Sequence, residues 1–94
     1  MTRERRRAYF DETKLHAVLK IINFRCRERI KMRLIVGNCE ELDSPSIWYV
    51  HFDATDREWR SIVQDFDAVG NITPIDRPET PQYVSYFRKN REDD

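Results

Sequence analysis

The side chains best suited to chemistry in this chain lie within residues 49–53. Residues two apart on a β-strand share a face, so an extended chain here puts Tyr49, His51 and Asp53 in one row. A histidine beside a carboxylate can serve as a general base, with the carboxylate orienting the ring. The row is therefore a candidate site for a small hydrolase or nuclease that uses His51 and Asp53.

Other signs of enzymatic chemistry are missing from the sequence. There is no phosphate-binding loop, no dinucleotide-binding fingerprint and no nucleophile motif to accompany His51 and Asp53. The cysteines and histidines do not form the close ligand pairs that zinc sites show. These residues are His16, Cys26, Cys39 and His51. We therefore expect no metal and no cofactor, and we favour a binding function over a catalytic one.

Length and composition predict one folded domain. The chain has 94 residues, of which 39% are apolar and 36% charged, so we expect a single domain over residues 1–94. We expect a flexible basic arm at residues 1–7 and a flexible tail at 90–94. No apolar stretch follows the basic start, and none approaches the roughly 20 residues that cross a bilayer. With two cysteines read as reduced thiols, we expect an intracellular, cytoplasmic protein without membrane contact.

Charge is balanced in total but uneven along the chain. The 17 Lys and Arg match 17 Asp and Glu. Cations dominate residues 1–33, whereas acids dominate residues 34–94. Such asymmetry favours a charged partner or pairing between copies. We therefore expect a protein partner of unknown identity, and a homodimer.

Two segments of the first half have clear periodicity. Residues 12–26 carry an apolar stripe at helical spacing, with Asp11 placed to cap it. The stripe consists of Leu15, Val18, Leu19, Ile22 and Cys26. Residues 29–36 alternate, which predicts a half-buried strand with a basic outer row of Arg29, Lys31 and Arg33. We expect Gly37 and Asn38 to end this strand.

The next strand and helix are predicted by local signals. Residues 46–53 are rich in aromatic and β-branched side chains, and alternation puts Trp48, Val50 and Phe52 on the core side. Thr55 and Glu58 have the spacing of a capping box, in which each side chain bonds the other's backbone N–H. A helix is therefore expected from residue 56 to about 69, ended by Gly70.

The two ends of the chain complete the predicted fold. Residues 5–10 form either a first strand, with Ala8 and Phe10 inward, or only a basic arm, and three consecutive arginines make a poor central strand. Residues 72–81 hold three prolines and cannot form a central strand. Residues 82–89 then read as the last strand. The order is (β)αββαβ, an α+β ferredoxin-like two-layer sandwich with two helices on one face of an antiparallel sheet.

The other face of this sheet is the predicted binding surface. It combines basic and aromatic side chains, which are enriched at protein interfaces. The set is Arg29, Lys31, Arg33, Tyr49 and His51, joined by either Tyr83 and Phe87 or Tyr86 and Arg88. The main hypothesis is a small non-enzymatic binding or regulatory module that acts through a protein partner or through self-association.

The alternative is a module that binds single-stranded nucleic acid. Residues 49–52, Tyr-Val-His-Phe, resemble the end of the third-strand motif of RNA-recognition domains. The resemblance implies that Tyr49 stacks on a base, and more weakly that Ile47 does. Trp48 stands where that motif has a small residue. In this alternative the basic contacts come from Arg5, Arg6 and Arg7, which would track phosphates.

Overall fold

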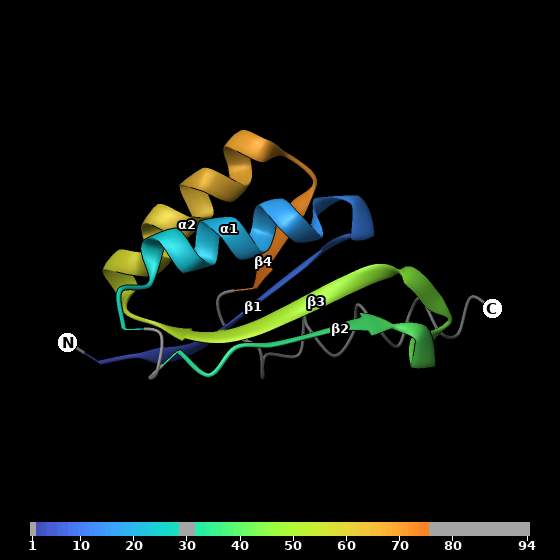
Figure 1. Cartoon of the computed structure of the whole chain (residues 1–94), viewed down its shortest axis with the longest axis horizontal. Helices are drawn as coiled ribbons and strands as arrows, with labels where there is room; N and C mark the ends of the chain where they lie inside the picture. Colours follow the sequence, from blue (N-terminus) through green and yellow to red (C-terminus); the bar gives the residue numbers. More distant parts are fainter. Residues whose placement is uncertain (1, 29–31, 76–94) are drawn as a thin grey trace.

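The structure is a computed structural model and describes residues 2–28 and 32–75. Within these residues, an antiparallel four-stranded sheet carries two helices on one face (Figure 1). The elements are β1 (Glu4–Asp11), α1 (Leu15–Arg25), β2 (Ile35–Cys39), β3 (Ser44–Ala54), α2 (Asp56–Val69) and β4 (Ile72–Ile75). The strand order β2-β3-β1-β4 is compatible with a ferredoxin-like sandwich, so the predicted α+β fold class is confirmed.

Strand β1 lies in the middle of the sheet, between β3 and β4. The expectation that three arginines exclude a central position is wrong, and Glu4–Arg7 belong to this strand instead of to a free arm. The reason is that alternation separates the arginines. Arg6 turns toward the helices, where its guanidinium bonds the Asp56 carboxylate at 2.7 Å and lies 5.5 Å from the Trp59 ring. A buried cation is tolerated because it is paired.

Strand β2 begins later than the sequence indicated. The alternating pattern predicted residues 29–36, whereas β2 starts at Ile35 and includes Gly37 and Asn38. Pairing with β3 decides this register, since Ile35 faces His51 and Gly37 faces Tyr49. Residues 29–31, with Arg29 and Lys31, lie outside the described part of the chain. Alternation alone could not show which part of the apolar run meets β3.

The fourth described strand is also different from the expected one. Strand β4 contains Pro74 and pairs with β1, so the segment with prolines does form a strand. Among the described strands β4 lies at an edge of the sheet, in agreement with the rule that excludes proline only from central strands. The last strand predicted at 82–89, with Tyr83, Tyr86, Phe87 and Arg88, lies outside the described residues.

Both predicted caps are present, but α1 begins at Leu15, later than the predicted start at residue 12. Asp11 accepts a hydrogen bond from the Thr13 backbone N–H at 2.8 Å and starts a 3-10 turn that leads into α1. At α2 the capping box is complete: the Glu58 N–H donates to Thr55 Oγ1 at 3.2 Å, and the Thr55 N–H donates to Glu58 Oε1 at 2.9 Å. The predicted bounds of α2 are confirmed.

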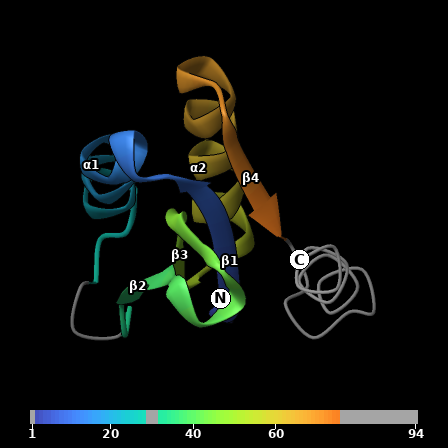
Figure 2. The same cartoon turned by 90° about the vertical axis from the view of Figure 1, so that its right-hand side faces the viewer.

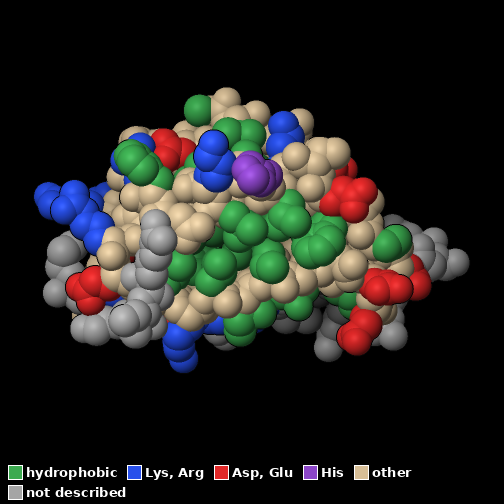
Figure 3. Space-filling model, viewed as in Figure 1, with side chains coloured by type: hydrophobic (Ala, Val, Ile, Leu, Met, Phe, Trp, Pro, Cys, Tyr) green, Lys and Arg blue, Asp and Glu red, His purple; other side chains and the backbone are tan. Residues whose placement is uncertain are grey.

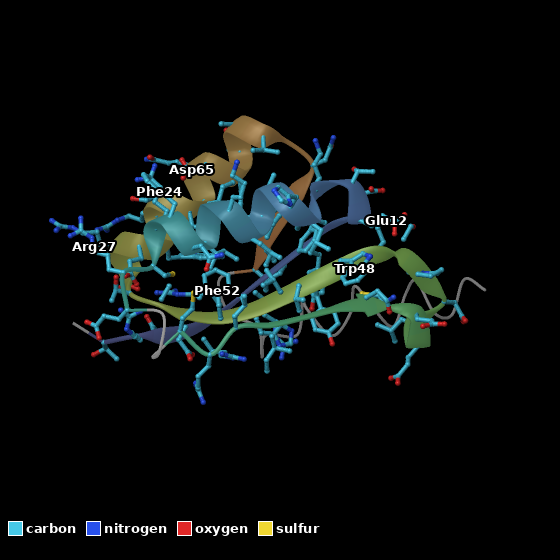
Figure 4. All side chains as sticks on the ribbon, viewed as in Figure 1. Glu12, Phe24, Arg27, Trp48, Phe52 and Asp65 are labelled. Carbon is cyan, nitrogen blue, oxygen red and sulfur yellow. The ribbon has the colours of Figure 1, made fainter. Side chains whose placement is uncertain are left out.

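The core lies between the sheet and the two helices. Figure 2 shows α1 over the β2 side of the sheet and α2 toward β4. Trp48 and Phe52 lie on the helix side of β3, as alternation predicted (Figure 4). The largest fully buried side chains are Phe52, Phe66, Ile22, Ile62, Val18 and Val50. Burial of these apolar side chains is the main stabilising contribution to the fold.

Candidate binding face

The face of the sheet turned away from α1 and α2, here called the distal face, holds the predicted site row. Residues that pair directly across neighbouring strands point to the same side. Arg5 pairs with Asp53, Arg7 with His51, and Tyr9 with Tyr49. The adjacent strand contributes Ile35 opposite His51 and Gly37 opposite Tyr49. Tyr49, His51 and Asp53 are therefore brought together with the arginines of β1.

Gly37 leaves room for the ring of Tyr49 to lie across β2. A Cβ atom at Gly37 would meet the Tyr49 hydroxyl oxygen at 2.7 Å and the adjacent ring carbon at 2.9 Å, closer than real contacts allow. The Tyr49 ring also lies against the His51 ring, with centroids 4.8 Å apart. Gly37 and His51 thus position the partly buried ring of Tyr49 on the distal face.

Asp53 is the charge centre of this face. Its buried carboxylate accepts hydrogen bonds from Arg33 Nε at 2.6 Å and Arg33 NH2 at 3.1 Å. Arg5 NH1 lies 3.3 Å from the same carboxylate. Burial alone would raise the pKa of Asp53, but the hydrogen bonds from Arg33 and the charge of Arg5 hold it below its usual value. Asp53 is therefore a structural anion that joins the segment before β2 to β1.

His51 is kept in its neutral form. Burial lowers its pKa to about 4, and the charges of Arg7 and Arg5 act in the same direction. A histidine with this pKa is neutral at pH 7 but is a weak base, since an effective general base has a pKa near the working pH. Because the Asp53 carboxylate is bound to Arg33, the predicted orienting role of Asp53 toward His51 has no support in the geometry.

A pocket of about 450 Å³ opens on the distal face beside Tyr49 and His51. The strands supply its floor, whereas a 3-10 turn at Glu40–Leu42 between β2 and β3 supplies one wall. The lining residues are Arg7, Tyr9, Asn38, Cys39, Glu40, Glu41, Leu42, Tyr49 and His51. The pocket is amphipathic, with aromatic side chains and charges of both signs.

The structure places the predicted site residues in different environments. Tyr49 and His51 share the pocket, and Arg33 lies beside them on Asp53. Arg6, which the nucleic-acid alternative grouped with Arg5 and Arg7, is 3% exposed on the helix side and is absent from the distal face. The three arginines therefore do not form one row along which phosphates could be tracked.

Three features of the pocket were missed by sequence reasoning. Tyr9 lies opposite Tyr49 in the pairing of β1 with β3. Only the assignment of β1 as a central strand beside β3 would have predicted this contact. The sequence predicts that Gly37 ends the strand, whereas in the structure it lies within β2 and leaves room for the Tyr49 ring. Glu40 and Glu41, which the sequence places in a loop, line the pocket.

Neither metal chemistry nor membrane insertion gains support from the described residues. Within residues 2–28 and 32–75, no three His, Cys, Asp or Glu side chains are grouped so that they could hold a metal ion. In the same part of the chain, no helix has the length and apolar character needed to cross a bilayer.

Cys26 is a buried thiol. Burial raises its pKa to about 11, and the charge of Glu58 adds to the shift. Cys26 is therefore an unreactive core residue.

Comparisons with protein families, with curated proteins and with solved structures gave no match.

Proposed function

We propose that this protein is a small non-enzymatic binding module that receives a segment of a partner protein in the distal-face pocket, against Tyr49 and His51. The observation that carries the proposal is the pocket itself, with partly buried rings at its floor and both Arg7 and acidic residues around it. Tyrosine and arginine are enriched among the residues that dominate binding energy at protein interfaces. A peptide, which offers apolar and charged groups together, matches such a lining.

Charge favours a protein segment over nucleic acid. Arg5 and Arg33 are both engaged by Asp53, which leaves less positive charge for phosphates. Glu40 and Glu41 line the pocket and would repel a phosphate backbone. Nucleic-acid affinity depends mainly on neutralising phosphates with Lys and Arg. The same lining would accept a peptide that carries a basic side chain toward the two glutamates.

Single-stranded RNA is the second candidate, because Tyr9 and Tyr49 lie opposite each other on the two middle strands. RNA-recognition domains stack bases on aromatics of a sheet face. Tyr9 is only 5% exposed, however, so one of the two rings is covered. The remaining exposed ring, Tyr49, offers a base one stacking surface instead of two.

The test is selection of peptides followed by mutation of the pocket. A random peptide library displayed on phage is selected on the wild-type protein, and fluorescence anisotropy then measures the affinity of the best synthetic peptide. Tyr49→Ala should weaken binding by about tenfold or more, as loss of a central aromatic anchor does. Tyr49→Phe should retain most affinity. Phe24→Ala is the matched control, because Phe24 is an exposed aromatic on α1 (Figure 4).

Gly37→Ala offers a second, independent variant. Its new Cβ displaces the Tyr49 ring without removing any group that could bind the peptide, so affinity should fall as in Tyr49→Ala. Selected peptides that bind Tyr49→Ala and Gly37→Ala as well as the wild type would refute the proposal.

The RNA arm uses oligo(U) at about 50 and 200 mM salt, where we expect affinity no tighter than about 10⁻⁴ to 10⁻⁶ M. Nanomolar, salt-sensitive binding that Tyr49→Ala abolishes would replace the protein partner with RNA.

A further inference from the structure

The two edges of the sheet are protected to different degrees. Edge strands present unpaired backbone groups, and proteins commonly block them with proline, lysine or a short strand. Strand β4 is short and contains Pro74. Strand β2 contains neither proline nor a charged residue between Ile35 and Cys39. Within residues 2–28 and 32–75, β2 has a neighbouring strand on one side only.

The unprotected edge also carries exposed apolar side chains. Leu34, Ile35 and Val36 are consecutive, and they are 37%, 51% and 39% exposed. Figure 3 shows hydrophobic side chains gathered between α1 and β2 in this view, continuous with the region of Trp48 that Figure 4 labels. Leu34 immediately precedes β2, whereas Ile35 and Val36 begin it. Exposed apolar residues at an edge strand are a feature of strands that pair with another chain.

The charges that flank β2 are self-complementary. Arg33 immediately precedes the apolar segment, and its side chain remains 72% exposed while it bonds Asp53. Glu40 and Glu41 immediately follow β2, and both are exposed. When two such strands run antiparallel around a two-fold axis, the Arg33 end of each faces the Glu40 and Glu41 end of the other.

We propose that β2 of this protein pairs antiparallel with β2 of a second copy, which joins the two sheets into one. The pairing satisfies the free backbone groups of both edges. In the register that sets Arg33 opposite the Glu40 and Glu41 end, it also brings the two Val36 side chains together near the two-fold axis. A second copy fits better than an unrelated strand because one segment supplies both halves of the charge pattern. The interface is at the edge of the sheet and does not rest on the proposed function of the distal-face pocket.

Sedimentation equilibrium from about 1 to about 500 µM protein tests the proposal, with a monomer–dimer equilibrium in the micromolar range expected for the wild type. Val36→Lys places like charges near the axis and should raise the dimer dissociation constant by about tenfold or more. Phe24→Lys is the control, since it adds the same charge at a 76% exposed apolar residue away from the edge. That control should leave the dissociation constant unchanged.

A second variant guards against misfolding of Val36→Lys. Glu40→Lys combined with Glu41→Lys changes only exposed side chains, and it should weaken the dimer most at low salt because each new lysine would face Arg33 of the other copy. Thermal melts followed by circular dichroism verify that each variant is folded.

Three results would overturn the proposal. A wild-type protein that is monomeric throughout the concentration range excludes the dimer. A dimer lost in Tyr49→Ala but retained in Val36→Lys would place the interface on the distal face. A monomer whose edge instead binds a selected peptide, with binding lost in Val36→Lys, would show that β2 receives a foreign strand.

Discussion

Arg5 and Arg6 are neighbours in β1, yet they stabilise the fold from opposite faces of the sheet. Arg6 is buried on the helix side, where it joins β1 to Asp56 at the start of α2 and covers the Trp59 ring. Arg5 lies on the distal face and, with Arg33, surrounds the buried carboxylate of Asp53. In the pair of Arg6 and Asp56, the cation is buried and the carboxylate is largely exposed. In the cluster around Asp53, the carboxylate is buried and the arginines are more exposed.

This contrast shows that residue type alone does not indicate the role of a charge. Alternation along one strand assigns adjacent arginines to environments that differ in burial and in partners. On the helix side Arg6 lies beside the Trp59 ring and bonds Asp56, so its environment combines an aromatic contact with an ion pair. On the distal face, hydrogen bonds from Arg33 to the Asp53 carboxylate hold the segment before β2, together with the Asp53 backbone N–H, which donates to the Met32 carbonyl at 2.7 Å.

The largest expected effect is on the helix side. Trp59 is 7% exposed and lies 5.9 Å from the Phe52 ring, measured between centroids. Trp59→Ala should lower the free energy of unfolding by about 3–5 kcal/mol, as large-to-small core substitutions do. Urea unfolding measures this loss, with Phe24→Ala as an exposed control expected to change stability by less than about 0.5 kcal/mol. Equal stability of the two variants would mean that Trp59 does not belong to the core.

The central carboxylate of the distal face should have the next largest effect. Asp53→Asn keeps the shape but removes the charge that Arg33 and Arg5 bind, so unfolding free energy should fall by about 1.5–3 kcal/mol. The matched control is Asp65→Asn, which breaks the more exposed pair with Arg25 and should cost about 0.2–1 kcal/mol. If both changes had the same cost, the contrast between buried and exposed carboxylates would fail.

Acid should reveal the neutral histidine of the distal face. Its folded pKa of about 4 lies below the unfolded value, so the unfolded chain takes up a proton first as pH falls. Stability should therefore decrease between about pH 6.5 and pH 4, by on the order of 1–2 kcal/mol after allowance for solvent screening. His51→Gln should remove this decrease. The urea midpoints of the wild type and of His51→Gln, measured at about pH 7 and pH 4.5, test this prediction. If the variant lost as much stability between the two pH values as the wild type, His51 would not be the cause of the decrease.

The smallest predicted effect concerns the cap of α2. Thr55→Ala removes the acceptor for the Glu58 N–H and should cost about 1 kcal/mol, whereas Thr55→Ser should cost very little. Thermal melts of the two variants are sufficient. A serine variant as unstable as the alanine variant would indicate that the threonine methyl group, and not the hydroxyl, is what matters.

Local signals in the sequence correctly predicted the parts of the fold that depend on near neighbours. The bounds of α2 and the core side of β3 follow from contacts a few residues apart: a capping box and a helical stripe in one case, alternation in the other. The row of Tyr49, His51 and Asp53 was likewise predicted, because residues two apart on a strand share a face whatever the strand pairs with.

Strand pairing decided the rest. The start of β2 at Ile35, the strand at Pro74 and the burial of Arg6 depend on which strands are neighbours, and those partners lie far away in the chain. Loop closure brings such partners together, and a pattern within one segment carries no record of the register that results. For the same reason the contact between Tyr49 and Gly37, and the capture of Asp53 by Arg33, appear only when β2, β3 and β1 are assembled into one sheet.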